Sequence, residues 1–165
     1  MTDIRPLCRD TLMPLLRLKV SEAQNDFVAP NVMTVAQATF EGGAEIYGLW
    51  DADTPVGMMA IINTAHPDQV PDEGERTNTL FVWRLMLDVA HQRQGHGQAA
   101  MEFAVARAQE LGLVDVTVSA VEAHGSAIPF YERFGFKRTG EVLDDEVVLS
   151  LPMDPDAGPI KLVVG

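Results

Sequence analysis

Residues 80–112, LFVWRLMLDVAHQRQGHGQAAMEFAVARAQELG, decide how this chain is expected to fold. The stretch begins with an almost continuously apolar run, as in a strand that is buried on both faces of a sheet. It continues through a turn that contains Gly95 and Gly97, and then through an amphipathic helix that Gly112 ends. The expected inward face of this helix is Ala100, Met101, Ala104, Ala108 and Leu111, and the expected outward face is Gln98, Glu102, Arg107 and Glu110. The predicted unit is therefore a buried strand, a glycine turn and a helix.

The glycine turn before this helix predicts a binding site for a phosphate or pyrophosphate. The first N–H groups of a helix have no intrahelical partner, and the helix dipole favours an anion beside them. Gly95 and Gly97 let the main chain approach such an anion without a Cβ in between. The sequence has neither the Gly-Lys-Ser/Thr of a P-loop nor a clear dinucleotide-binding G-x-G-x-x-G frame. The alternative interpretation is that the glycines only turn the chain.

The composition describes one acidic globular domain. The chain has 165 residues and a formal net charge of −12, which opposes non-specific binding to nucleic acids or anionic membranes and favours cationic substrates. Cys8 is the only cysteine, so neither an intrachain disulfide nor a thiolate metal cluster is expected. The histidines have no metal-ligand spacing, so no metal is expected. No apolar run is as long as a signal peptide or a membrane span, which predicts a cytoplasmic location.

The rest of the sequence predicts further strands and helices around this unit. Pro14 is expected in the first turn of the first helix, and Gly57 predicts a bulge or a close approach between backbones. Residues 65–76 are expected to form an open loop. Residues 1–152 are expected to form the domain and 153–165 a C-terminal tail. Strands are expected at 3–7, 45–50, 55–63, 79–88, 114–120, 137–141 and 147–151, and helices from 10 or 11 to 20, from 34 to near 42, from the glycines to 111, and at 126–134.

Two segments resemble the GCN5-related N-acetyltransferase (GNAT) superfamily. Gln92-Arg93-Gln94-Gly95-His96-Gly97 is similar to the [Gln/Arg]-x-x-Gly-x-[Gly/Ala] loop that binds acetyl-CoA in that family. Residues 127–136, AIPFYERFGF, resemble its A-x-x-F-Y-x-x-x-G-F segment, and the order and spacing of the two segments also fit. The resemblance implies a single-domain α/β GNAT fold. Such a fold has a mixed sheet of about six to seven strands, splayed at the acetyl-CoA site and flanked by about four helices.

Shorter stretches resemble the bacterial diamine and spermine/spermidine acetyltransferases. They are Gln24-x-x-Phe27-Val28-Ala29-x-Asn31 and residues 53–57, 85–88 and 139–142. This resemblance implies acetyl transfer from acetyl-CoA to a primary amine, such as the polyamines spermidine and spermine. The alternatives are another amine acceptor (an antibiotic, an amino acid or a protein N-terminus) or a noncatalytic acyl-CoA-binding regulatory module. A homodimer is common in this family, so the resemblance also allows one.

The resemblance assigns roles to residues of both segments. Acetyl-CoA is expected to bind in the gap between the strands at 79–88 and 114–120. A main-chain N–H near Leu87 is expected to stabilise the oxyanion that develops during the reaction. Tyr131 is expected to protonate the departing thiolate, because a phenol with a pKa of about 10 suits that role. Main-chain groups of Leu87, Asp88 and Val89 are expected to lie along the pantetheine arm. The pyrophosphate is expected to bind to the main-chain amides of Gln92, Arg93, Gln94, Gly95, His96, Gly97 and Gln98. The Arg93 side chain can add a charged contact to a phosphate.

The sequence departs from the family pattern at two places. His124 stands where the family commonly has asparagine, and it is expected to contact the coenzyme. Some polyamine acetyltransferases carry a carboxylate on the central strand before the loop, where this chain has residues 83–84, Trp-Arg. No general base is identifiable. Glu22, Asp26 and Glu45 are candidates, and Glu22 and Asp26 are expected to bind the acceptor.

Overall fold

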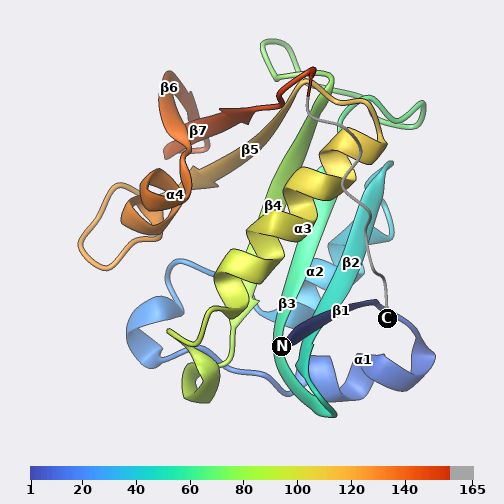
Figure 1. Cartoon of the computed structure of the whole chain (residues 1–165), viewed down its shortest axis with the longest axis vertical. Helices are drawn as coiled ribbons and strands as arrows, with labels where there is room; N and C mark the ends of the chain where they lie inside the picture. The colour runs from blue at the N-terminus through green and yellow to red at the C-terminus, as the bar shows by residue number, and fades with distance from the viewer. Residues whose placement is uncertain (157–165) are drawn as a thin grey trace.

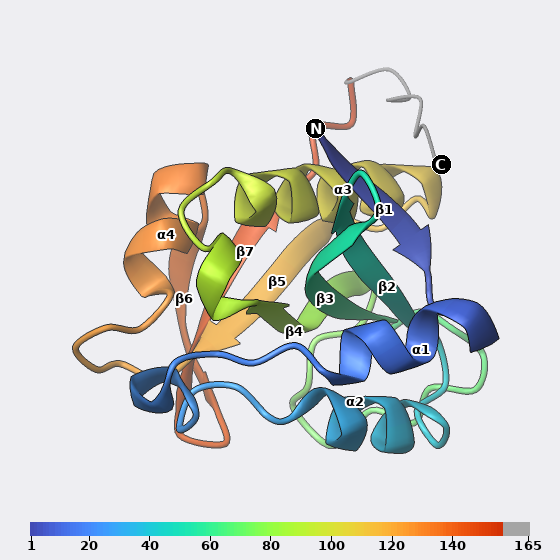
Figure 2. The same ribbon diagram turned by 90° about the horizontal axis from the view of Figure 1, so that it is seen from below.

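The structure is a computed structural model that describes residues 1–156. It contains a seven-stranded sheet in the order β1-β2-β3-β4-β5-β7-β6. Helices α3 and α4 cover one face of the sheet, and α1 and α2 cover the other (Figures 1 and 2). The predicted mixed α/β fold is therefore confirmed. Most of the expected tail, residues 157–165, lies outside the described residues.

The expected strands and helices all form, with shifted ends. The strands are β1 (Thr2–Pro6), β2 (Ala44–Asp51), β3 (Thr54–Asn63), β4 (Thr79–Leu87), β5 (Asp115–Ala120), β6 (Lys137–Leu143) and β7 (Glu146–Pro152). The helices are α1 (Arg9–Leu16), α2 (Asn31–Ala38), α3 (His96–Glu110) and α4 (Ile128–Phe134), with short 3₁₀ turns η1 (Glu22–Gln24) and η2 (Val89–His91).

The first two helices differ from the prediction because of a contact between them. Asn31 is buried, and its Nδ2 donates to the Leu15 carbonyl at 2.8 Å, which satisfies a carbonyl near the end of α1. The helix α1 therefore ends at Leu16, not at residue 20, and α2 begins at Asn31, not at Thr34. The expectation that Pro14 lies in a first turn was also wrong, because it lies inside α1.

Helix α3 packs on the sheet through small side chains. Ala100, Ala104 and Ala108 are fully buried, as predicted, and their size lets the helix lie close to β4. Arg107, expected to face outward, is instead partly buried, because its guanidinium pairs with Glu45 of β2 at 2.7 Å. On the opposite face of the sheet, a smaller cluster lies under α1 and α2: Leu15, Trp50 and Met58.

The two parallel strands at the centre of the sheet, β4 and β5, separate toward their C-terminal ends. β4 and β5 pair in parallel only from Thr79–Asp115 to Val82–Val118. One step further, a register shift between β3 and β4 leaves Trp83 without a partner on β3, so that β4 bends at this bulge. The close approach predicted at Gly57 is confirmed, since a Cβ there would lie 2.6 Å from the Met86 carbonyl oxygen.

A buried carboxylate holds the closed end of this opening together. Asp115 accepts hydrogen bonds from Arg76 Nη1 at 2.9 Å and from Ser150 Oγ at 2.7 Å. Arg76 also donates through Nε to Glu141 at 2.6 Å. The network joins the segment before β4 to β5, β6 and β7, where the parallel pairing begins.

We expect Arg76→Met to lower the free energy of unfolding by about 1–2 kcal/mol, because it removes a charged partner from a buried carboxylate that keeps only Ser150. Urea unfolding at pH 7 measures the change. The matched control is Arg138→Met, because Arg138 also bridges two carboxylates, Glu122 and Glu132, but at the surface. It should show no measurable change. Equal losses in both variants would contradict the structural role of the Asp115 network.

Candidate active site

A cavity of about 410 Å³ lies where β4 and β5 part. Residues 82–85 of β4 and 119–121 at the end of β5 form two of its walls, and residues 25–30 before α2 form a third. No ladder bond joins the two strands beyond Val82–Val118 in the described sheet. Main-chain N–H and C=O groups at these two edges are therefore available to a ligand that lies between the strands.

The glycine turn presents a row of unpaired amides beside this cavity. Gly95 is the N-cap of α3 with φ +90°, and Arg93 also has a left-handed φ of +61°. Within residues 1–156, no main-chain N–H from 92 to 98 donates a hydrogen bond to the protein. Gly97 lies close to α4, since a Cβ there would be 3.3 Å from Phe130 Cζ. The expected pyrophosphate-binding amides therefore lie together at one helix N-terminus, where an anion is favoured.

The side chains of this turn hold it in place. Gln92 Nε2 donates to Gln24 Oε1 at 2.7 Å and to the Leu87 carbonyl at 3.2 Å. Gln24 returns a hydrogen bond of 3.2 Å to Gln92, so the two amides join η1 to the turn. The buried His96 places Nδ1 2.9 Å from Thr2 Oγ1. The turn is thus fixed by side chains from two distant parts of the chain, and its main-chain amides are not used for this.

The residues that follow β4, Asp88 and Val89, form hydrogen bonds within the protein. The amide of Asp88 donates to the Val56 carbonyl at 2.9 Å, and that of Val89 donates to the Lys19 carbonyl at 2.8 Å. The Asp88 carboxylate accepts from the Lys19 amide at 3.0 Å. Of the three residues expected along the pantetheine arm, these two therefore have engaged amides. The Asp88 carbonyl is engaged as well, since it accepts from the His91 amide at 2.9 Å.

Tyr131 of α4 lies in the cavity wall. Its side chain is only 7% exposed, and its ring packs against Phe130 and Phe136, with centroids 5.3 and 5.7 Å away. Burial, and next the negative charge of Glu146, raise the pKa of Tyr131 to about 12. Tyr131 therefore stays protonated at physiological pH and can act as a proton donor in the cavity.

Two charged residues of the cavity were not predicted as site residues. Glu146, at the start of β7, lines the cavity and accepts a hydrogen bond of 2.5 Å from Ser119 Oγ. It reaches this place because β7 pairs with β5, an arrangement that no local sequence pattern encodes. Arg84 of β4 lines the same cavity, and its Nη1 donates to Thr34 Oγ1 of α2 at 2.9 Å.

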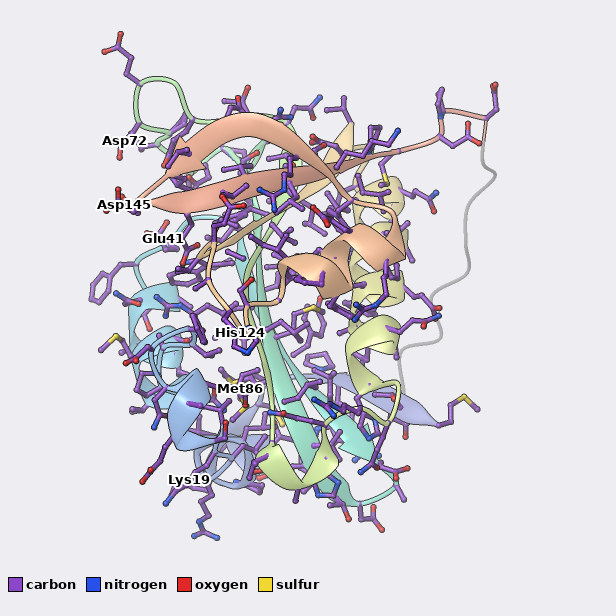
Figure 3. All side chains as sticks on the ribbon, turned by 90° about the vertical axis from the view of Figure 1, so that its left-hand side faces the viewer. Lys19, Glu41, Asp72, Met86, His124 and Asp145 are labelled. Carbon is purple, nitrogen blue, oxygen red and sulfur yellow. The ribbon has the colours of Figure 1, made fainter. Side chains whose placement is uncertain are left out.

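The expected acceptor-side and coenzyme-side residues are not all at the cavity. Asp26 lines it, whereas Glu22 on η1 is exposed and lies outside the lining. Glu45 is held by Arg107, and Tyr47 donates to it at 2.5 Å, also outside the lining. His124 is exposed on the loop between β5 and α4, where Figure 3 labels it.

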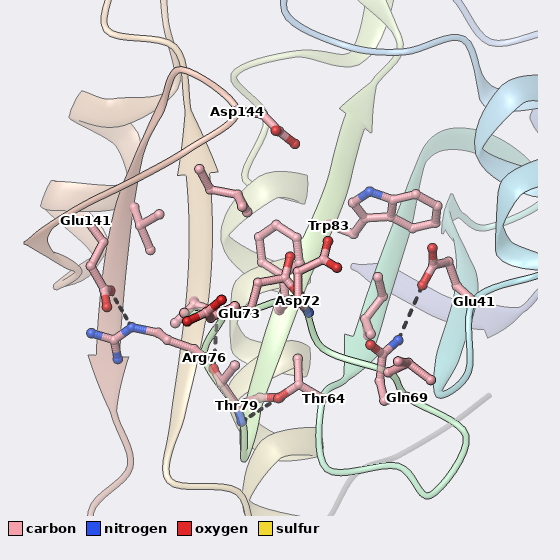
Figure 4. A pocket seen from close by; sticks show the side chains of 18 of the residues that line it. Glu41, Thr64, Gln69, Asp72, Glu73, Arg76, Thr79, Trp83, Glu141 and Asp144 are labelled. Atoms are coloured by element: carbon pink, nitrogen blue, oxygen red, sulfur yellow. Dashed lines mark hydrogen bonds and ion pairs between the residues drawn. The ribbon is translucent and has the colours of Figure 1, made fainter.

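A second cavity, of about 450 Å³, adjoins the first along β4. Phe81 and Trp83 are part of its lining, and Trp83 lines both cavities. The predicted loop at 65–76 forms one wall and the β6–β7 turn another (Figure 4). Its one positive side chain in the described structure, Arg76, already pairs with two carboxylates. Six acidic residues line it: Glu41, Asp72, Glu73, Glu75, Glu141 and Asp144.

Two classes of feature are absent from the described residues. No helix in residues 1–156 has the length and apolarity needed to cross a membrane. The same residues contain no cluster of three or more histidine, cysteine, aspartate or glutamate side chains arranged to hold a metal ion.

The chain resembles known proteins in sequence. The model of the acetyltransferase (GNAT) family matches residues 14–136. Probable N-acetyltransferase family 8 member 5 of Mus musculus is 27% identical over 143 residues, which are 86% of this chain but only 62% of that protein.

Solved structures resemble the chain over most of its length. The GNAT domain of S. lividans PAT has a TM-score of 0.72 and 17% identity, covering 91% of this chain and 89% of that one. A Bacillus subtilis acetyltransferase in complex with CoA has a TM-score of 0.62 and 17% identity, and the match covers 93% of this chain and 99% of that one. The ribosomal-protein-S18-alanine N-acetyltransferase of Escherichia coli has a TM-score of 0.65 and 16% identity, and the match covers 98% of this chain and 100% of that one. At such identities, the likeness shows the fold.

We expect Tyr131 to ionise late in an ultraviolet titration of the folded protein. The chain has two tyrosines, so Tyr47→Phe leaves Tyr131 as the only one, and its absorbance change should be centred near pH 12. Adding Glu146→Gln should lower this midpoint, because it removes a nearby negative charge that raises the pKa. The control Glu122→Gln, at an exposed ion pair, should leave the midpoint unchanged. A midpoint near 10 before the protein unfolds would contradict the burial of Tyr131.

Proposed function

The chain belongs to the acetyltransferase (GNAT) family, whose model matches residues 14–136, and we propose that it transfers the acetyl group of acetyl-CoA to a primary amine. The observation that carries the proposal is the opening between β4 and β5 beside the unpaired amides at the start of α3. The mouse relative is named as a probable N-acetyltransferase, and the Bacillus subtilis structure contains CoA. Both support this function.

Acetyl-CoA would bind as an anion held mainly by the main chain. The amides from Gln92 to Gln98 would bind its pyrophosphate, with Arg93 as an added charge. The pantetheine arm would follow the open edge of β4 toward Leu87, Asp88 and the Val89 carbonyl. This path delivers the thioester to the cavity that Tyr131 lines.

The reaction would be direct acyl transfer. The neutral amine attacks the thioester carbonyl carbon, a C–N bond forms, and a main-chain N–H near Leu87 stabilises the oxyanion. As the C–S bond breaks, Tyr131 gives its proton to the departing thiolate. The proton lost by the amine returns to Tyr131, either directly or through Glu146. Holding two reactants together contributes up to about 7–11 kcal/mol to such a reaction.

Glu146 is the best-placed proton acceptor among the carboxylates considered. It lines the cavity with Tyr131, and its charge acts on the pKa of Tyr131. Glu22 and Glu45 lie outside the cavity lining, and Asp26 lies on a different wall, before α2. We therefore place Glu146 as the base and Asp26 as a contact for the cationic acceptor.

The acidic second cavity supports a cationic acceptor. A polyamine such as spermidine or spermine, the acceptor expected from the sequence, would find six carboxylates there. A noncatalytic acyl-CoA-binding module would share the coenzyme site but would turn over no amine. The contact of His124 with the coenzyme, the cytoplasmic location and the homodimer stay predictions from the sequence.

Gly95→Asp is expected to weaken acetyl-CoA binding tenfold or more, since it places a carboxylate beside the amides proposed to hold the pyrophosphate, and about 1.4 kcal/mol suffices for tenfold. Isothermal titration calorimetry measures the change. The control is Gly112→Asp at the other end of α3, since both glycines have positive φ and open space at the Cβ position. If acetyl-CoA does not bind the wild type at millimolar concentration, or if both variants bind alike, the proposed coenzyme site is wrong.

Replacing Tyr131 with Phe should lower kcat by about 100-fold while acetyl-CoA affinity is kept, because general acid catalysis contributes about that much or more. Thiol release over an amine panel, including spermidine, spermine, putrescine, lysine and aminoglycosides, measures turnover. Tyr47→Phe, at the other tyrosine, is the control and should retain activity. Unchanged turnover in Tyr131→Phe would remove the general-acid role. Tight acetyl-CoA binding with no turnover of any amine would favour the noncatalytic module.

A further inference from the structure

Arg84 is a partly buried cation without a partner anion. Of the nine arginines, all of which lie within the described residues, three are partly buried: Arg5, Arg84 and Arg107. Arg5 pairs with Asp3 and Arg107 with Glu45, but among residues 1–156 no carboxylate pairs with Arg84. Burial lowers the pKa of Arg84, an effect that the charge of Glu146 partly opposes.

The bulge in β4 orients this guanidinium toward the cavity. Because Ile61 pairs with Val82 and Ala60 with Arg84, Trp83 is an extra residue between them. Trp83 and Arg84 both line the cavity at the opening of the sheet, although they are consecutive in the strand. The Arg84 Cζ lies 4.3 Å from the centroid of the Trp83 ring, so the indole supports the guanidinium.

Two neutral groups hold Arg84 without neutralising it. Thr34 Oγ1 accepts one N–H at 2.9 Å, and the Trp83 ring covers the guanidinium. A guanidinium has five N–H donors in a planar fork that matches a carboxylate. A partly buried charge is costly unless an opposite charge pairs with it. The arrangement thus leaves a fixed set of donors that a bound carboxylate would satisfy with two parallel hydrogen bonds.

The cavity therefore has charges of both signs on different walls. Arg84 lies on β4, whereas Glu146 lies on β7 and Asp26 before α2, and all three line the same cavity. The charge of Glu146 acts on the pKa of both Tyr131 and Arg84, so Glu146 is within electrostatic reach of the proposed proton donor and of the guanidinium. A ligand with an amine and a carboxylate close together would match both walls.

We propose that Arg84 binds a carboxylate of the acceptor, so that the acceptor is a small amino carboxylate, such as a free amino acid, and not the polyamine that the sequence resemblance implies. The proposal rests on the proposed acetyl transfer. The carboxylate pairs with Arg84 and thereby turns the amine toward Glu146 and the thioester. A polyamine would instead place a cation against Arg84. The acidic second cavity is compatible with an amino carboxylate whose side chain is positively charged.

Matched pairs of acceptors test this inference. Thiol release with acetyl-CoA is compared for lysine and cadaverine, phenylalanine and phenethylamine, and histidine and histamine, which differ by the carboxylate. We expect the wild type to favour the amino acid of the best pair at least 100-fold in kcat/KM, because a site built for a polar group rejects ligands without it. Arg84→Gln should raise KM for that amino acid at least tenfold and change the constants of the decarboxylated amine less than threefold. Arg17→Gln, an exposed arginine of α1's C-cap, should behave as the wild type.

The inference is overturned if the wild type prefers the decarboxylated amines or spermidine, or if Arg84→Gln affects both members of a pair alike. A binding measurement separates this outcome from failure of the proposed function. Thermal unfolding of the CoA-loaded protein is followed with and without each amino acid. If no acceptor is acetylated, acetyl transfer is wrong. A stabilisation by an amino acid that Arg84→Gln abolishes would still support carboxylate binding, whereas no stabilisation by any amino acid would overturn it.

Discussion

The limited parallel pairing of β4 with β5 is the constraint on which the rest of the structure depends. Parallel strands that paired along their whole length would satisfy each other's main-chain groups and leave no opening. Here the pairing ends at Val82–Val118, and the bulge at Trp83 bends β4 away. The Asp115 network holds the strands together at the closed end. A clamped end and an opened end together make a wedge-shaped site.

The N-terminus of helix α3 lies near this opening only because the helix packs close to the sheet. Its buried alanines, Ala100, Ala104 and Ala108, keep the helix axis near β4. Gly97 allows a similar approach to α4 at Phe130. The N-terminus of α3 thus lies at the end of β4 by packing, since Gly97 lies close to Leu87 as well as to Phe130. Small side chains and glycine therefore have an electrostatic consequence, because they set where the helix dipole points.

The sequence predicted the features that local patterns encode. The buried strand, the glycine turn, α3 and the close approach at Gly57 each depend on neighbouring residues or on a missing Cβ. Features that depend on the order of strands in the sheet could not be predicted from local patterns. Glu146 is in the cavity because β7 lies beside β5, and Arg107 is turned inward by Glu45, 62 positions away. In both cases the decisive partner is distant in sequence, so no local pattern places either side chain.

The negative net charge and the positive Arg84 act over different distances. Exposed charges act through water, where physiological salt screens them beyond about 8 Å, so the acidic surface can attract an ammonium group but cannot orient it. Arg84 acts at contact distance, in a partly buried wall where screening is weaker, and its planar donors require a ligand of defined shape. An acceptor that is drawn in by its amine and held by its carboxylate would arrive with one end already aligned. Tyr131 and Glu146 then need to act only on the other end.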